Sequence, residues 1–259
     1  MEVSLRALPL AQVSAGWHIL DFRNLTGPPL PGYPLKKGKA FLPLSSNDTP
    51  RSLFAHTAFE HQISFRHPLN THRLVRRTNA REMFIYTDGS CYGHKDRDGI
   101  SQRRGGCAFV FKPAPYNLEE KSCSFRLERL GPTGIEYPQT SNRAKLRAVI
   151  AALQFRVWRG EYFKSIVIGT DSEYVVLGIT DRIETWAQSE WQTFGGITVN
   201  NKDLWKLLLV EINKLAKDGC EVHFWLLPID LNEEADWLAK EATAEPDVPK
   251  FLKYFGALV

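Results

Sequence analysis

The sequence predicts an α/β fold: a mixed five-stranded sheet, made of an antiparallel meander extended by parallel strands, flanked by helices. Two observations predict it. Residues 165–170 form an apolar run that leads directly into a helical pattern, as a buried parallel strand leads into its crossover helix. Residues 203–219 place apolar side chains at helical spacing and end on glycine, which is typical of an amphipathic helix with a C-terminal stop.

Three strands are expected to open this domain. Residues 83–87 are short and apolar, residues 104–111 begin with glycines and continue apolar, and residues 122–130 alternate apolar and polar side chains. Strands that follow one another in this way pair antiparallel, as a meander. The first half of the domain therefore supplies the antiparallel part of the sheet.

The helix that follows carries an unexpected residue. Apolar side chains recur at helical spacing from 146 to 153, and Thr140, Ser141 or Asn142 can cap the helix. Lys145 then falls in the first turn, where unpaired N–H groups and the positive end of the helix dipole favour a carboxylate. Local physics therefore predicts an acid at a position where the chain has a lysine.

The second half of the domain is expected to alternate helices with parallel strands. The apolar strand leads into a helix, the glycine-terminated helix comes next, and a strand at 221–228 and a helix at 232–242 complete the domain. The whole order is β-β-β-α-β-α-α-β-α. It predicts one α/β domain at residues 81–245.

The flanking segments have a different composition. Residues 1–80 are rich in Pro and Gly, are basic, and lack a sustained period, so we expect an irregular N-terminal arm. The basic run 71–81 is either a solvated linker or an arm that contacts phosphates. Residues 246–259 are expected to be a C-terminal tail. The arm should pack in part on the domain through Phe54, Phe59, Ile63 and Phe65.

Composition limits the classes of function. The 259 residues are 43% hydrophobic with a net charge of +4, which is globular and only mildly basic. There is no membrane-spanning apolar run and no signal-peptide pattern, so we expect an intracellular protein, nuclear or cytoplasmic. The sequence has four cysteines, Cys91, Cys107, Cys123 and Cys220, and they form no C-x-x-C pair. Their spacing therefore indicates neither a zinc site nor a disulfide framework.

Three aspartates lie where an α/β domain commonly places a site. Asp88 follows the first strand, Asp171 follows the parallel strand at 165–170, and Asp236 lies on the last helix. Sites in such sheets lie outside the carboxyl ends of strands, so these carboxylates could converge. An aspartate after a strand is also ordinary turn chemistry, and spacing alone leaves both interpretations open.

Five motifs occur in the order found in type 1 ribonuclease H domains: YTDGSC, QTSNRAKLRAVIAAL, IGTDSEYVVLGI, NKDLWKLL and PIDLNEEADWLAKEA. Together they resemble the fungal members of that family most closely. The resemblance covers residues 83–244 and implies a ribonuclease H-like fold. It also implies a metal-dependent endonuclease that acts on RNA/DNA hybrids.

The resemblance implies a catalytic set of four carboxylates that bind two magnesium ions, with manganese as an alternative. It assigns metal-ligand positions to Asp88, Asp171 and Asp236 and places the missing carboxylate, a glutamate, at Lys145. Three carboxylates and an ammonium carry too little negative charge for two dications, so the second metal site is doubtful. Three alternatives remain open. The ammonium takes part of the missing metal's place, another acid reaches in from Glu136, Glu173 or Glu233, or Lys145 was introduced deliberately to trap an inactive complex.

The resemblance also implies a substrate surface at Cys91, Thr140, Ser141 and Asn142, of which Thr140 corresponds to a phosphate-contacting position. A hybrid duplex is recognised by shape, phosphates and the 2′-OH. We therefore expect a ribonuclease H-type endonuclease for RNA/DNA hybrids whose activity is impaired by Lys145. The alternative is a catalytically inactive module that binds hybrid, double-stranded RNA or a protein partner.

Overall fold

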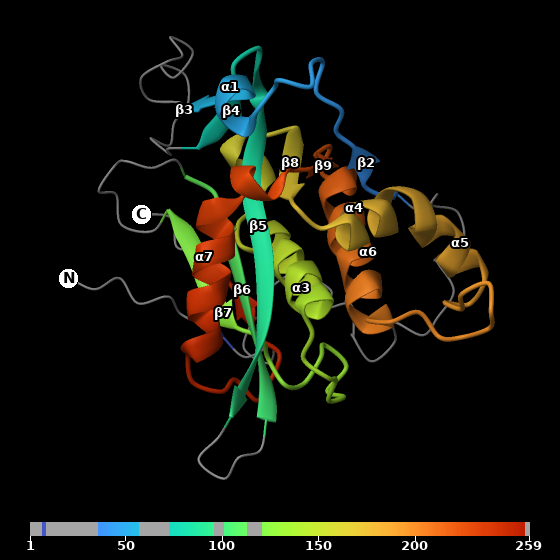
Figure 1. Cartoon of the computed structure of the whole chain (residues 1–259). Coiled ribbons are helices and arrows are strands. Elements are labelled where there is room, and N and C mark those ends of the chain that lie inside the picture. The colour runs from blue at the N-terminus through green and yellow to red at the C-terminus, as the bar shows by residue number, and fades with distance from the viewer. Residues whose placement is uncertain (1–6, 9–35, 57–72, 96–100, 113–120, 257–259) are drawn as a thin grey trace.

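The order of elements follows the prediction. The computed structural model describes residues 7–8, 36–56, 73–95, 101–112 and 121–256. The predicted order β-β-β-α-β-α-α-β-α is confirmed for the main elements (Figure 1). They are β5 (Asn79–Lys95), β6 (Ser101–Val110), β7 (Ser122–Arg126), α3 (Ser141–Gln154), β8 (Ser165–Thr170), α4 (Glu173–Leu177), α6 (Lys202–Lys217), β9 (Glu221–Leu226) and α7 (Glu233–Glu241).

Shorter helical elements join these. A π-helical turn, Gly178–Arg182, continues α4 into α5 (Ile183–Gln188). Three 3₁₀ turns lie at Trp158–Glu161, Ile229–Leu231 and Ala242–Ala244. No helix in the described ranges is both long enough and apolar enough to cross a bilayer.

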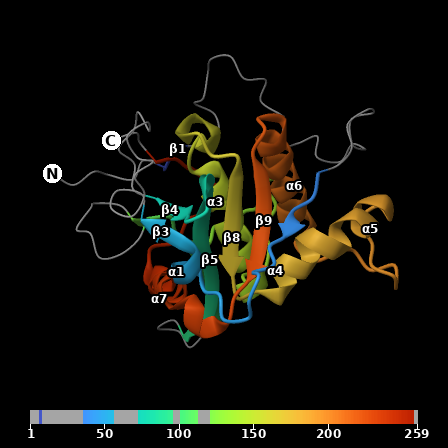
Figure 2. The same ribbon diagram turned by 90° about the horizontal axis from the view of Figure 1, so that it is seen from above.

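The sheet is mixed, as predicted. Strands β5, β8 and β9 pair parallel, whereas β5, β6 and β7 form an antiparallel meander. Three further strands extend this five-stranded sheet to eight within the part of the chain that the structure describes: β2 (Lys39–Ala40), β3 (Phe54–His56) and β4 (Leu74–Arg76) (Figure 2). They come from the segment predicted to be an irregular arm, because strands of two or three residues are too short to show an alternating pattern.

The ends of the chain also contribute pairing. In the predicted C-terminal tail, β10 (Lys253–Tyr254) pairs antiparallel with β1 (Ala7–Leu8). A short helix, α1 (Pro50–Leu53), precedes β3 and is capped by the side chain of Thr49. The predicted domain boundaries at residues 80 and 245 stay predictions.

The N-terminal segment covers one face of the sheet. Phe41 and Phe54 pack with Phe84, Val167 and Trp225 in a cluster of buried apolar side chains. The ring of Phe54 lies 5.0 Å from that of Phe84 and 6.2 Å from that of Phe41. The predicted packing of the arm through Phe54 is therefore confirmed, while Phe59, Ile63 and Phe65 lie outside the described residues.

This packing gives a first testable prediction. Phe54→Ala should lower the free energy of unfolding by about 3 kcal/mol, because the ring is only 2% exposed and its loss leaves a cavity. Leu44→Ala is the matched control from the same segment: Leu44 is 95% exposed, so no measurable loss is expected. Urea denaturation measures both, and equal stability of the two variants would show that this segment is not part of the core.

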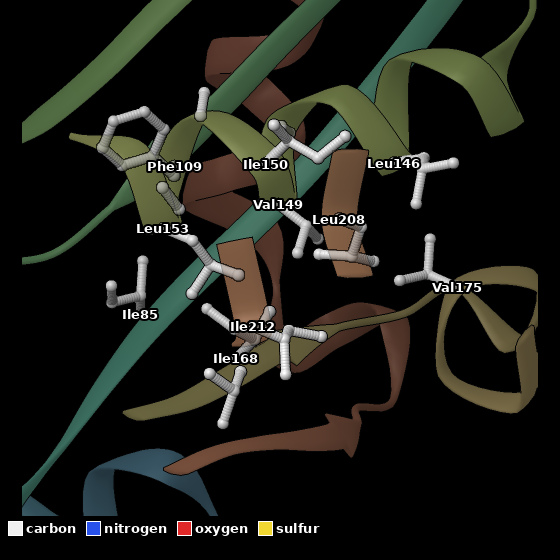
Figure 3. Packing of buried hydrophobic residues seen from close by; sticks show 14 of the residues in the cluster. Ile85, Phe109, Leu146, Val149, Ile150, Leu153, Ile168, Val175, Leu208 and Ile212 are labelled. Carbon is white, nitrogen blue, oxygen red and sulfur yellow. The ribbon is translucent and has the colours of Figure 1, made fainter. Parts of the chain in front are cut away.

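The opposite face of the sheet is covered by α3 and α6. Figure 3 shows Leu146, Val149, Ile150 and Leu153 of α3 gathered with side chains of the sheet and of α6. Nearly every residue of α3 after its first two is buried, since the helix lies between the sheet and α6. This burial fixes α3 in one orientation, which decides where Lys145 points.

Candidate active site

Asp88 and Asp171 lie beside one another at an edge created by the end of β8. The prediction that the first strand stops before Asp88 is wrong, because β5 continues and Asp88 pairs with Ala108 of β6. The parallel pairing of β5 with β8 ends at Tyr86 and Gly169, however. Asp88 therefore lies just beyond this pairing, next to the residue that follows β8, Asp171.

Helix α3 begins too early to place Lys145 in its first turn, where the sequence predicts it. Thr140 is the N-cap, and its hydroxyl accepts a hydrogen bond of 3.2 Å from the backbone N–H of Arg143. Lys145 therefore lies in the second turn of α3, beyond the unpaired N–H groups. The prediction of an acid from local helix physics is wrong for this reason.

The side chain of Lys145 bridges the two aspartates. Its Nζ donates to Oδ1 of Asp88 and to Oδ1 of Asp171, each at 2.5 Å. The side chains are 18%, 2% and 11% exposed for Lys145, Asp88 and Asp171, respectively. An ammonium thus lies between two nearly buried carboxylates.

A glycine permits this approach of α3 to the sheet. A Cβ atom at Gly89 would lie 2.1 Å from the backbone nitrogen of Lys145 and 2.2 Å from the carbonyl carbon of Ala144. Contacts this close are excluded, so only glycine fits at this position. Gly89 therefore allows Lys145 to reach the carboxylates.

Lys145 and Asp88 form an ion pair at neutral pH. Burial raises the pKa of Asp88 from 3.8 to about 6, although the neighbouring Lys145 ammonium opposes this shift. Burial alone lowers the pKa of Lys145, but the Asp88 and Asp171 carboxylates more than compensate, so the pKa of the amine is raised. At pH 7 the amine is charged and most Asp88 carboxyls are ionised.

The pKa of Asp88 predicts a pH dependence of stability. A carboxyl whose folded pKa lies above its unfolded value binds protons more tightly in the folded state, so stability falls as pH rises from about 4 to about 6. The Asp88 contribution should be a loss of about 2 kcal/mol across this window. Urea denaturation of the parent and of Asp88→Asn checks this: the variant should lack that component, and identical pH profiles would contradict it.

Asp236 lies on α7, which packs against β5 and β6. Asn232 begins this helix, is buried, and donates through Nδ2 to the carbonyl oxygen of Thr87 at 3.1 Å, which fixes the helix to β5. The Asp236 carboxylate accepts a hydrogen bond of 2.5 Å from Lys240. This hydrogen bond raises the pKa of Lys240, and the charge of Asp88 adds a smaller effect in the same direction.

The residues present do not fit a two-metal centre. The Lys145 ammonium pairs with one oxygen of Asp88 and one oxygen of Asp171. The Lys240 ammonium pairs with one oxygen of Asp236. Within the described ranges, no group of three or more His, Cys, Asp or Glu side chains is placed to hold a metal ion. Three glutamates were candidates to replace the missing carboxylate: Glu136, Glu173 and Glu233. Each of them is exposed, and none completes such a group.

The family follows from comparison with known proteins. The RNase H family profile matches residues 80–244. The chain belongs to the RNase H family. The resemblance of the five motifs to ribonuclease H is thereby confirmed, whereas the fungal subtype stays a prediction.

Relatives of this RNase H chain include bacterial proteins. It is 39% identical over 126 residues to the Ribonuclease H of Treponema pallidum subsp. pallidum, covering 48% of this chain and 69% of that protein. It is 34% identical over 164 residues to the Ribonuclease H of Xanthomonas oryzae pv. oryzae, covering 63% and 93%. Among solved structures, the foamy viral protease-reverse transcriptase in complex with RNA/DNA hybrid is 19% identical with a TM-score of 0.44, over 62% of this chain and 20% of that chain.

The four predicted substrate residues of the RNase H chain lie around the start of α3. Cys91 on β5 donates through Sγ to the carbonyl oxygen of Gln139 at 3.4 Å, and burial raises the pKa of its thiol. Ser141 and Asn142 are exposed in the first turn. Thr140 and Asn142 line a pocket of about 610 Å³ between this turn and the N-terminus of α6.

Other residues of the site were not predicted. The side-chain amide of Gln139 accepts from the backbone N–H of Gly105 at 2.6 Å and donates to the carbonyl of Leu127 at 2.9 Å, which positions the segment before α3. Lys240 could have been found, since it lies four residues after Asp236 on a helix. Asn232 could have been found as a residue type that caps helices, but its bond to Thr87 depends on tertiary packing.

Proposed function

We propose that this protein is a ribonuclease H that binds RNA/DNA hybrids and whose magnesium-dependent hydrolysis of the RNA strand is suppressed by Lys145. One observation carries the proposal: the Lys145 ammonium lies 2.5 Å from both Asp88 and Asp171. In the family arrangement, a glutamate at this position and these two aspartates act together as ligands. Here the residue at this position is Lys145, whose ammonium pairs directly with both aspartates.

The size of the effect follows from the charge. Two unit charges at ~4 Å interact with about 4 kcal/mol at an effective dielectric constant near 20, and solvent screening reduces this value. Exchanging a carboxylate for an ammonium removes an attraction toward a dication and adds a repulsion. A loss of about 3 kcal/mol in metal-dependent transition-state stabilisation corresponds to a rate about a hundredfold lower. The residues that would hold magnesium or manganese are Asp88, Asp171 and Asp236.

The surface beside the site supports a duplex as the ligand. Ser141 and Asn142 present exposed polar side chains, and Thr140 lines the neighbouring pocket together with Lys202 and Lys206. Polar groups suit contacts to 2′-OH groups and base edges, and lysines suit contacts to phosphates.

The test uses the parent protein with an end-labelled hybrid, in magnesium and in manganese. Fluorescence anisotropy should show binding of the hybrid, with double-stranded RNA and double-stranded DNA of the same sequence as competitors. A sequencing gel should show the RNA strand intact over times at which Lys145→Glu cleaves it. Cleavage by the parent at the rate of that variant would refute suppression, and the absence of binding to any duplex would refute the nucleic-acid function.

A further inference from the structure

A groove lies at the opposite end of β8 from the candidate active site. It has a volume of about 440 Å³ and is formed by the segment that contains β2, by the starts of β8 and β9, and by the C-terminal end of α6. Lys164 immediately precedes β8 and Asp171 follows it, so six residues of strand, about 20 Å, separate the groove from the carboxylates. The groove is therefore a separate surface.

The segment that forms one wall of this groove is held in place at several points. The side chain of Asn213 on α6 accepts a hydrogen bond from the backbone N–H of Lys36 and donates one to its carbonyl oxygen, each at 3.1 Å. A Cβ atom at Gly38 would lie 2.3 Å from the ring of Phe224, so glycine lets the segment lie against β9. β2 then pairs parallel with β9 (Figure 2). The groove thus exists before a partner arrives and needs little reorganisation to bind one.

The groove carries an excess of positive charge. Four lysines and one glutamate are among its lining residues, which leaves a net charge of +3. Lys37 and Lys39 each pair with a glutamate, at 2.8 and 2.7 Å, through side chains that are 36–57% exposed. Exposed ion pairs of this kind are weak, so an incoming anion can replace them. Lys36 and Lys164 are exposed, and no ion pair joins either of them to another described residue.

The floor of the groove is aliphatic. It is made by Ile212 and Ala216 of α6 and by Val222 of β9, and Ile212 and Val222 are only 2% and 3% exposed. A nucleic-acid backbone would use the lysines and leave this floor unfilled, because phosphates and sugars are polar. A ligand that carries carboxylates on both sides of an apolar side chain complements both the lysines and the floor.

We propose that this groove binds an acidic peptide segment of a partner protein, with an apolar side chain of the peptide on the aliphatic floor and its carboxylates at the lysines. Lys36, Lys37 and Lys39 precede residue 80, where the match to the RNase H family begins. The groove is therefore a feature of this chain and lies partly outside the matched domain. Asp88 and Asp171 stay accessible while the peptide is bound, since they lie at the other end of β8.

The experiment titrates the full chain into a fluorescein-labelled peptide in which one leucine is flanked on both sides by aspartates and glutamates. Binding is followed by anisotropy at constant ionic strength. In one control peptide serine replaces the leucine, and in the other asparagine and glutamine replace the acids. The leucine peptide should bind at least about tenfold more tightly than either control, which corresponds to about 1.4 kcal/mol. A control peptide that binds as tightly as the leucine peptide, or no binding of the leucine peptide, would overturn the proposal.

Charge reversal locates the binding surface. Lys36→Glu combined with Lys164→Glu changes two exposed residues of the groove and should weaken binding of the leucine peptide at least about tenfold. Arg129→Glu combined with Lys250→Glu is the matched control, because it makes the same change of net charge at exposed residues outside the groove. Its affinity should stay within about threefold of the parent's. Circular dichroism checks that both variants are folded.

The same variants distinguish a peptide from nucleic acid as the occupant. The groove variant should bind an RNA/DNA hybrid with a Kd within about threefold of the parent's, because the lysines lie away from the carboxylates. A loss of hybrid affinity as large as the loss of peptide affinity would overturn the proposal and assign these lysines to phosphate contacts. Unchanged peptide affinity of the groove variant would also overturn it. Neither result bears on the proposed suppression of hydrolysis by Lys145.

Discussion

Lys145→Glu should convert the parent into an active nuclease, with cleavage of the RNA strand of a hybrid at least about a hundredfold faster in magnesium. The reason is local: the substitution removes the ammonium that bridges Asp88 and Asp171 and supplies the carboxylate that the proposed function expects at this position. The measurement is the initial rate of cleavage of an end-labelled hybrid under single-turnover conditions.

Two controls isolate the role of the new carboxylate. Lys145→Gln removes the ammonium without adding an acid, so it should regain much less activity than Lys145→Glu. The double variant Lys145→Glu with Asp88→Asn should return to the parent rate, because Asp88 is the most buried of the three aspartates. If Lys145→Glu were as inactive as the parent, the defect would lie outside position 145.

Gly89→Ala should have the largest effect on stability. Its Cβ atom would overlap the backbone of Lys145 and Ala144, and backbone atoms of a buried helix cannot move aside independently. We expect a loss of about 4 kcal/mol or more in the free energy of unfolding, measured by urea denaturation. The variant should also bind hybrid more weakly, because α3 carries both Lys145 and the residues of the first turn.

Gly160→Ala is the control for this prediction. A Cβ atom at Gly160 would meet Val157 at 3.7 Å, an ordinary contact, so the same substitution should change stability by less than about 0.5 kcal/mol. Similar stability of the Gly89→Ala variant and the parent would mean that α3 lies farther from β5 than the structure places it.

The central fold was predictable because its signals are long or strongly apolar. The run at 165–170 is buried at every position, and α6 keeps helical spacing over four turns. The strands at 39–40, 54–56 and 74–76 could not be predicted, because their pairing depends on partners far away in the sequence. Of the four side chains predicted to pack on the domain, Phe54 lies within the described residues, and it does pack there.

The candidate site was predictable only in part. Strand ends and the motif resemblance together identified Asp88, Asp171 and Asp236, but the roles of these residues stay predictions. The contact of Lys145 with both aspartates depends on where α3 begins, and three residues, Thr140, Ser141 and Asn142, were suitable caps. Only the packing of α3 against Gly89 decides the distance from Lys145 to the carboxylates.

The most direct test of the account is a calorimetric titration of magnesium into the parent and into Lys145→Glu, both without nucleic acid. Because the Lys145 ammonium already pairs with Asp88 and Asp171, the parent should give no saturable binding heat in millimolar magnesium, whereas the variant should give a binding isotherm. Magnesium binding by the parent with the affinity of the variant would contradict the claim that Lys145 takes the place of a metal ion.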